Sequence, residues 1–185
     1  GTVGANSLLV TVVSLSSLTI FLIPLIALML SYDAVIGEVE RGTLLLLLSY
    51  PLARWHAIGG KFLGHLSVLA FATVVGYGSA GAVLVFQGVD ADNANWFSFA
   101  AVIGSSVLLG AAFLAIGYLI STIVKERATA AGIAVAVWLL FVLIYDMALL
   151  GLLVADGGNG IGETVFNALL LANPTDAYRL FNLAG

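Results

Sequence analysis

Asp146 is the ionisable residue that lies deepest in an apolar part of the sequence, since the run 128–154 carries no other charge. A carboxylate in hydrocarbon costs about 3 kcal/mol on insertion scales, so such a group usually faces the interior of a helix bundle. Two roles are open for it. Asp146 either belongs to a transport pathway or has a structural role, in which it reaches the headgroup region or forms a hydrogen bond with a neighbour such as Tyr118 or Tyr145.

The histidines and methionines are spaced too far apart to predict a metal site. His56 and His65 are nine residues apart, whereas helical zinc sites bring histidines together at a spacing of three or four. Cu(I) prefers sulfur ligands, and the chain has only Met29 and Met147 and no cysteine. We therefore expect no metal ligands in this chain.

Catalytic motifs are missing from the sequence as well. No glycine-rich phosphate-binding loop follows a predicted strand, so the chain is not expected to bind or hydrolyse ATP. The apolar segments contain no paired acids and no serine–histidine pair. The sequence therefore predicts a protein that is not itself an enzyme.

The charged residues concentrate in the segment 31–61, which is much longer than the roughly 2–8 residues of a simple helix connection. Gly42 can end a helix that continues from the preceding segment, because glycine adopts positive φ at little cost. Thr43 is a possible N-cap for a second short helix over 44–49, which Pro51 would end. A third helical turn is expected over 52–60.

Five consecutive leucines, 44–48, form the apolar part of this loop. As a helix they are about 7 Å long, too short to cross a bilayer. They are expected to contact either a partner protein or the bilayer interface, and the sequence leaves both alternatives open.

The elements that must position these residues follow from the composition. Of the 185 residues, 62% are hydrophobic and 9% charged, and the mean hydropathy is +1.15. In soluble domains about a quarter of the residues are charged. The net charge of −4 and the lack of a basic block exclude a nucleic-acid partner, and the composition excludes a disordered chain. The chain is an integral membrane protein.

Four apolar stretches are long enough to cross a bilayer, which takes about 20 residues of helix. They are continuously apolar rather than alternating, which favours helices over a β-barrel, and their glycines allow close packing. We predict an all-α polytopic transmembrane bundle in a single domain. The four predicted spans are 8–30, 62–86, 96–124 and 128–154.

Basic residues predict the orientation in the membrane. Arg41, Arg54 and Lys61 lie between the first two spans, and Lys125 and Arg127 lie between the last two. Because basic loops stay in the cytoplasm, both loops are predicted to be cytoplasmic and the multi-pass chain to lie in a bacterial inner membrane. The second loop is either an anchor or a further contact for a partner.

The outer region 155–185 contains one apolar helix candidate, 164–171, which is too short to span. It is expected to re-enter the membrane or to lie on its outer surface. Asp176 and Arg179 are three residues apart and are expected to pair on a helix. A start without methionine and a hydrophilic end are typical of a fragment, and we expect one span to be missing at each side.

The first cytoplasmic loop resembles that of type-2 ABC exporter permeases, on the residues Glu38, Glu40, Arg41, Gly42, Thr43, Leu44, Pro51, Arg54, Gly60 and Lys61. The order of spans and loops agrees over nearly the whole chain. The resemblance implies six spans per subunit, a homodimer in the bilayer, and a separate ABC ATPase subunit that holds the ATP and Mg²⁺. In that family the loop forms a coupling helix in a groove of the ATPase subunit.

The resemblance also implies roles for particular residues. The expected interface with the ATPase subunit comprises Glu38, Glu40, Arg41, Gly42, Thr43, Leu44, Leu45, Leu48, Pro51, Arg54, Lys125, Glu126 and Arg127. The expected cap of the pathway, or contact with a periplasmic accessory protein, comprises Asn173, Pro174, Asp176, Tyr178 and Arg179.

A narrower resemblance rests on the tail residues 173–176, 178–180 and 182–183, together with the run 44–52. These residues are similar to the branch of the family that serves the maturation of the copper centres of nitrous oxide reductase. The cargo stays open at this point. Because this chain offers copper no relay of sulfur ligands, copper is expected to be handled by partner proteins or missing spans, or the cargo is another species such as sulfur. The alternatives are export of a drug, lipid or polysaccharide, and a membrane scaffold without transport.

Overall fold

The computed structural model describes residues 2–43, 53–86, 93–156 and 163–183, and every regular element among them is a helix. The long helices of the first three spans are α1 (Thr2–Ser31), α4 (Arg54–Phe86) and α5 (Asn93–Ile123). The fourth span is assembled from α6 (Arg127–Leu139), the π-helix η1 (Leu140–Ile144) and α7 (Tyr145–Asp156). Three short helices are α2 (Ile36–Glu40), α8 (Glu163–Ala172) and α9 (Pro174–Leu183).

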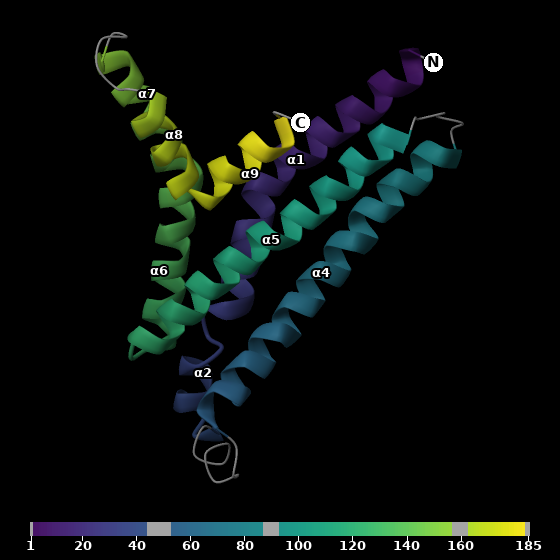
Figure 1. Cartoon of the computed structure of the whole chain (residues 1–185). Coiled ribbons are helices and arrows are strands. Elements are labelled where there is room, and N and C mark those ends of the chain that lie inside the picture. Colours follow the sequence, from purple (N-terminus) through teal and green to yellow (C-terminus); the bar gives the residue numbers. More distant parts are fainter. Residues whose placement is uncertain (1, 44–52, 87–92, 157–162, 184–185) are drawn as a thin grey trace.

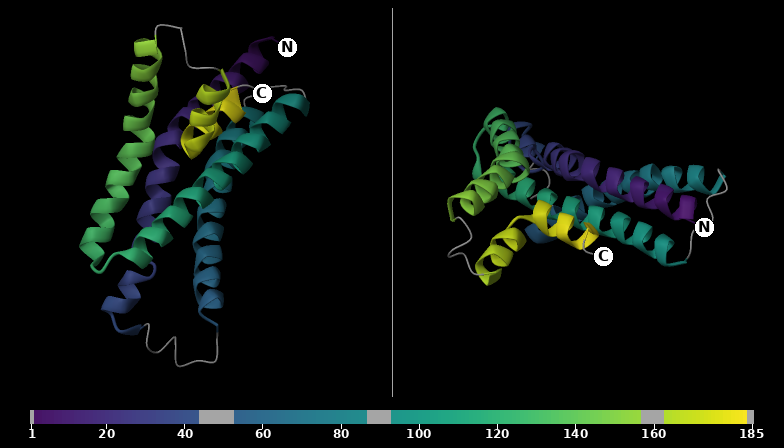
Figure 2. Two further views of the ribbon diagram at one scale, coloured as in Figure 1. Left: turned by 60° about the vertical axis from the view of Figure 1, so that its left-hand side comes forward. Right: turned by 90° about the horizontal axis from the view of Figure 1, so that it is seen from above.

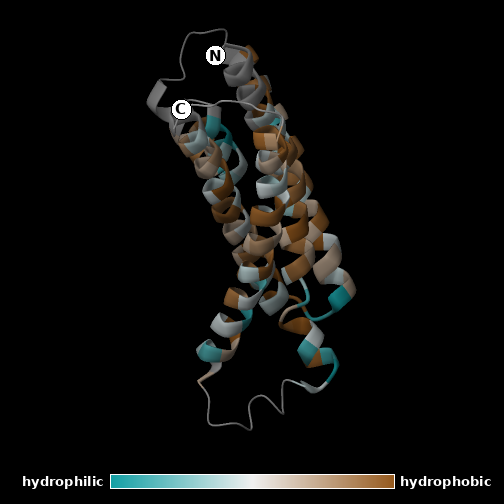
Figure 3. Ribbon diagram, turned by 90° about the vertical axis from the view of Figure 1, so that its right-hand side faces the viewer, coloured by the Kyte–Doolittle hydropathy of each residue, from teal (hydrophilic) through white to brown (hydrophobic). Residues whose placement is uncertain are grey.

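The predicted all-α transmembrane bundle is confirmed. Four helical segments in the described ranges are long and apolar enough to cross a membrane: Val13–Glu40, Trp55–Phe86, Trp96–Ile123 and Arg127–Leu152. Hydrophobic residues cover the middle of the long helices, whereas hydrophilic residues gather near their ends (Figure 3). This distribution is the one that a lipid solvent requires of a helix bundle.

Helix α5 is the centre of the bundle and packs against α1, α4, α6 and α9. The fourth span meets the other helices near the end that carries α2 and diverges from α4 toward the other end (Figures 1 and 2). Because α2 and the α5–α6 turn hold the basic loops, we refer to their end as the cytoplasmic end and to the other as the outer end.

The core lies where α1, α5 and the fourth span meet. Leu28, Phe113 and Leu114 have no exposed surface. The ring of Phe113 packs edge-to-face against Phe141, with the ring centroids 5.9 Å apart. This contact joins η1 to the centre of the bundle.

The boundaries of the first cytoplasmic loop differ from those predicted. Gly42 has φ of +71°, as expected for the residue that ends the first helical stretch. However, α4 begins at Arg54, so the residues 54–61 belong to the second span and not to a separate turn. A helix that is nucleated in an apolar span extends easily, since each added residue gains one hydrogen bond. The predicted helix 44–49 lies outside the described residues.

Two glycines of α5 permit the closest helix contacts in the bundle. A Cβ atom on Gly117 would overlap the hydroxyl of Ser31 on α1, and one on Gly110 would lie 2.5 Å from Leu69 Cδ2 on α4. Small residues at such positions let helices pack when lipid supplies no hydrophobic driving force. The contact of α1 with α5 therefore depends on Gly117.

We expect Gly117→Val to destabilise the bundle by about 1–3 kcal/mol, because the larger side chain separates α5 from α1. The measurement is the thermal unfolding temperature and the yield of monodisperse protein in detergent. Gly104→Val is the matched control, because nothing lies within 4 Å of a Cβ atom built there. Equal effects of both substitutions would contradict the proposed close contact.

Candidate functional site

Helix α2 begins without a cap of its own and is capped instead by a residue of α5. The backbone N–H groups of Val35 and Ile36 donate to Ser121 Oγ over 2.9 and 3.0 Å. Ser121 is buried at the cytoplasmic end of α5. These N–H groups are among those that a helix leaves unpaired at its start, so Ser121 satisfies them and fixes α2 to the third span.

Lys61 of α4 holds α2 from a second side. Its Nζ donates to the backbone oxygen of Ala34 over 2.6 Å and lies 2.6 Å from Glu38 Oε1. The side chains of Lys61 and Glu38 are 33% and 19% exposed, so the pair is better shielded from water than a surface ion pair. The second span is thereby joined to α2.

The start of α6 supplies the third contact. Arg127 Nη2 lies 2.8 Å from Asp33 Oδ2, and the Arg127 backbone N–H donates to Glu40 Oε1 over 2.8 Å. The guanidinium also lies 6.0 Å from the centroid of the Tyr32 ring. A carboxylate at a helix N-terminus is favourable, so Glu40 stabilises the beginning of the fourth span.

The structure brings together part of the predicted ATPase interface. Glu38, Glu40 and Arg127 meet around α2, whereas Lys125 and Glu126 are exposed in the α5–α6 turn. Of the other predicted residues, Arg41, Gly42 and Thr43 are exposed directly after α2. Leu44, Leu45, Leu48 and Pro51 lie outside the described residues, and Arg54 is described only as the first residue of α4.

Four residues whose side chains take part in this contact were missing from the predicted interface, namely Tyr32, Asp33, Lys61 and Ser121. Lys61 belongs to the loop motif but was assigned no contact. Ser121 closes an apolar run, and a serine there carries no spacing that predicts which backbone groups it caps. Only the fold reveals it.

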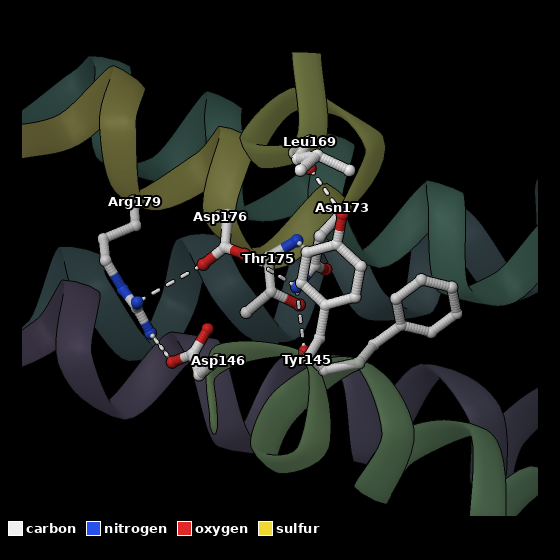
Figure 4. Close-up of polar contacts among 8 residues, drawn as sticks. Tyr145, Asp146, Leu169, Asn173, Thr175, Asp176 and Arg179 are labelled. Carbon is white, nitrogen blue, oxygen red and sulfur yellow. Dashed lines mark hydrogen bonds and ion pairs between the residues drawn. The ribbon is translucent and has the colours of Figure 1, made fainter. Parts of the chain in front are cut away.

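A second cluster of charged residues lies between α7 and α9. Arg179 Nη2 lies 2.8 Å from Asp146 Oδ2, and Arg179 Nη1 lies 3.3 Å from Asp176 Oδ1 (Figure 4). The pairing of Asp176 with Arg179 is as expected. The partner of Asp146 is Arg179 and not a tyrosine, because Tyr145 OH donates to the Leu169 oxygen over 2.6 Å. The other candidate, Tyr118, pairs through its hydroxyl with His65.

Asn173 connects this cluster to the π-helix. Its Nδ2 donates to the Phe141 backbone oxygen over 2.9 Å and to Asp176 Oδ2 over 3.0 Å. Its Oδ1 accepts the N–H of Thr175 over 3.0 Å, so Asn173 also caps α9. A π-turn interrupts the regular backbone hydrogen bonds of a helix, and such turns are frequent at functional sites.

Most of the predicted outer residues face the bundle. Asn173, Asp176 and Tyr178 are buried, and Pro174 is the first residue of α9, where its missing N–H is harmless. Tyr178 OH and Ser106 Oγ of α5 are 3.1 Å apart. In this arrangement these side chains hold α9 against the spans and do not form an outward surface.

Asp176 lies on α9, outside the four spans, and its exposed fraction is 2%. Burial and the neighbouring Asp146 raise the pKa of Asp176 from 3.8 to about 6, against the opposing effects of Arg179 and Asn173. A carboxyl group whose pKa is raised by folding binds more protons in the folded than in the unfolded protein. Stability therefore falls as the pH rises through 6.

We expect the free energy of unfolding to increase by about 1 kcal/mol when the pH is lowered from 7 to 5, since Asp176 gains a proton in the folded protein. Asp176→Asn should remove this increase. Thermal unfolding of the purified protein at both pH values measures it, with Glu126→Gln, at an exposed acid, as the control. An unchanged pH dependence in Asp176→Asn would assign the effect to another group.

Within the described ranges, no three His, Asp or Glu side chains lie close enough to hold a metal ion. The two clusters are instead sets of hydrogen bonds and ion pairs that join helices. Their chemistry is that of connecting and positioning helices.

These features define a polytopic membrane protein in which a short helix at the cytoplasmic end connects the ends of three spans. Residues 2–184 match the family model of the ABC-2 family transporter protein. The chain belongs to this family and is a permease subunit of an ABC transporter, a multi-pass protein of the inner membrane.

The chain is also similar to individual members of the family. It is 49% identical over 186 residues to the probable ABC transporter permease protein NosY of Pseudomonas aeruginosa. It is 48% identical over 187 residues to the protein of the same description from Stutzerimonas stutzeri. Both comparisons cover 100% of this chain and 67% of the relative, so the chain is a NosY-like permease.

Proposed function

We propose that this chain couples ATP hydrolysis by a separate ABC ATPase subunit to movement of its own spans, and that α2 receives the motion. The proposal is supported most directly by the convergence of three spans on α2. Ser121 links α2 to α5, Lys61 links it to α4, and Arg127 links it to α6. A displacement of α2 would therefore reach all three spans.

A partner at this end would find an accessible polar surface. An open groove of about 550 Å³ lies between α2 and α6, and it is lined by Tyr32, Glu40, Glu126, Arg127, Ala128 and Ala131. Arg41 and Lys125 are exposed nearby and would orient a charged partner. ATP and Mg²⁺ would be bound by the ATPase subunit, and this chain would contribute no cofactor.

We further propose that the transporter is a homodimer and serves the maturation of the copper centre of nitrous oxide reductase together with a periplasmic accessory protein. The support is the similarity to the NosY permeases and to the branch of the family defined by the tail residues. The two methionines, Met29 and Met147, lie on different helices and are both exposed. Copper handling is therefore assigned to partner proteins, and this chain supplies motion or exports another species.

The test is co-expression of the permease, as the full-length protein, with the ATPase subunit, followed by purification in nanodiscs. We expect the ATPase to co-purify and its hydrolysis to depend on the permease. Ser121→Ala leaves the N–H groups of Val35, partly buried, and Ile36, buried, without an acceptor. The loss costs about 1–3 kcal/mol for a buried group. We expect the Ser121→Ala variant to retain the bound ATPase. We also expect it to lower, at least fivefold, the amount of nitrous oxide reductase that shows the absorption spectrum of the complete copper centres.

Thr122→Ala is the matched control, because Thr122 is the exposed neighbour and donates only to the Leu119 oxygen of its own helix. It should behave like the unmodified protein. A purified permease without any bound ATPase would overturn the proposed coupling. A normal copper content of nitrous oxide reductase in cells without the permease would overturn the proposed role in copper-centre maturation.

A further inference from the structure

The fourth span is one continuous helical rod, residues 127–156, formed by α6, η1 and α7. It is the least buried of the four spans: 11% of its most apolar window is buried inside the protein, against 39% for the first and third spans. A span with so few packing contacts can move with respect to the others at a lower cost. Its apolar packing, which includes Phe141 against Phe113, is supplemented by polar contacts toward both ends.

At the cytoplasmic end the rod is attached to α2. Arg127 forms the ion pair with Asp33, and its backbone N–H is bound by Glu40, each over 2.8 Å. The rod is therefore joined to the short helix on which the proposed ATPase contact is built. Further along, the indole of Trp138 donates to the Phe21 oxygen of α1 over 3.0 Å.

At its outer half the rod is attached to the α8–α9 pair by three contacts, which Figure 4 shows together. Tyr145 OH donates to the Leu169 oxygen, Asn173 Nδ2 donates to the Phe141 oxygen, and Arg179 pairs with Asp146. The last of these is the only one of the three that joins full charges on both helices.

Arg179 already has a carboxylate on its own helix, Asp176, at 3.3 Å. A second acid, Asp146, is therefore not needed to neutralise it, and keeping that acid in an apolar span is costly. The free-energy cost of Asp146 in the span is explained if its contact with Arg179 has to hold α9 onto the rod during movement.

We propose that the rod carries motion from α2 at the cytoplasmic end to α9 at the outer end, and that Asp146 and Arg179 are the positioning residues that join α9 to the rod. This inference rests on the proposed coupling to an ATPase. It adds that the pair α8–α9 is driven through the fourth span, and that α9 moves together with α7 while its hydrogen bonds to Ser105 and Ser106 of α5 are exchanged.

Distances between spin labels test this inference, and the absence of cysteine from the chain gives a clean background for labelling. One pair, Phe97→Cys on α5 and Phe181→Cys on α9, reports movement of α9, since these side chains are 77% and 62% exposed. A second pair, Met147→Cys and Phe181→Cys, reports the distance between α7 and α9; Met147 is 72% exposed. Both pairs are measured in the full-length complex with its ATPase, without nucleotide and with ATP trapped.

We expect the α5–α9 distance to change by several ångströms between the two states while the α7–α9 distance stays within about 1 Å. Arg179→Gln and Asp146→Asn should abolish the change in the α5–α9 distance. The exchange Asp146→Arg with Arg179→Asp should restore it, because the same charges then face each other across the two helices. Asp176→Asn is the matched control and should leave the change intact, since it spares the contact with α7.

Several outcomes would overturn the inference. One is an α7–α9 distance that changes with nucleotide as much as the α5–α9 distance does. This comparison needs only the two labelled proteins and no substitution in the ion pair. Another is a full response in Arg179→Gln or Asp146→Asn, and a third is an exchange variant that assembles without responding. No response in the unmodified complex, with the ATPase bound and active, would reject the rod while leaving the proposed function intact. Loss of the ATPase from the complex would reject the proposed function instead.

Discussion

Replacement of Lys61 by methionine is expected to lower ATP-dependent activity at least tenfold while the protein still inserts and folds. The substitution removes the 2.6 Å hydrogen bond to the Ala34 oxygen and the 2.6 Å ion pair with Glu38. Ala34 is 4% exposed, so its carbonyl loses its partner without gaining full access to water. Such losses cost about 1–3 kcal/mol for each unsatisfied group, and more for a charged one.

The structural effect of Lys61→Met is expected to be confined to α2, because the spans are held in the membrane by apolar side chains and not by the contacts of Lys61. Insertion depends on the apolar side chains of α4, and methionine at the edge of that span does not weaken them. The expected state is therefore a folded bundle from which α2 has separated on the side of α4. Movement of α2 would then no longer reach the second span.

The measurements are ATP hydrolysis by the reconstituted complex and protease cleavage near α2, which should increase in Lys61→Met. Gly64→Met is the matched control, because it adds the same side chain to α4 about one turn away, at an exposed position where nothing lies within 4 Å of a Cβ atom. A double variant of Glu38→Gln with Lys61→Met should be less impaired than Lys61→Met alone, since no unpaired carboxylate remains. Equal effects of Lys61→Met and Gly64→Met would show that the contacts of Lys61 with Ala34 and Glu38 do not carry the activity.

The spans were predictable from the sequence because the solvent that they face imposes a simple rule. Lipid offers no hydrogen bonds to a backbone, so long uncharged stretches must be helical, and their lengths fix the number of crossings. Gly42 was predictable for a similarly local reason, since ending a helix with positive φ is a property of one residue. Local rules of this kind account for the fold class and for the end of α2.

The contacts between helices were not predictable in the same way. Asp146 and Arg179 are 33 residues apart, and no periodicity joins a residue of a span to one of a short outer helix. Ser121 and the N–H group of Val35 are 86 residues apart. The chemistry of these residues indicates that each needs a partner, but the partner is selected by the packing of α5 and α9, which one sequence does not encode in any short pattern.

Replacement of Arg179, in the cluster of charged residues between α7 and α9, is expected to have the largest effect on stability. Arg179→Leu would leave the carboxylates of Asp146 and Asp176 facing each other, with Asp176 2% exposed and without a cation. Removing one partner of a buried ion pair typically costs about 3–5 kcal/mol. Because the Arg179 side chain is 37% exposed, we expect about 2–4 kcal/mol, measured as the loss of thermal stability in nanodiscs.

The cost should disappear largely when the acids are removed together with the arginine, since replacing a whole ionic cluster by neutral side chains is often close to neutral. Arg179→Leu with Asp146→Asn and Asp176→Asn is therefore expected to unfold near the temperature of the unmodified protein while failing in nucleotide-dependent movement of α9. Lowering the pH should also restore part of the stability of Arg179→Leu, because the pKa of Asp176 is raised to about 6 and a proton then neutralises this carboxylate in the folded state. A single variant as stable as the triple one at neutral pH would mean that Arg179 compensates no charge, and that α9 is held by other contacts, namely Asn173 with Phe141, Tyr178 with Ser106 and Asn182 with Ser105.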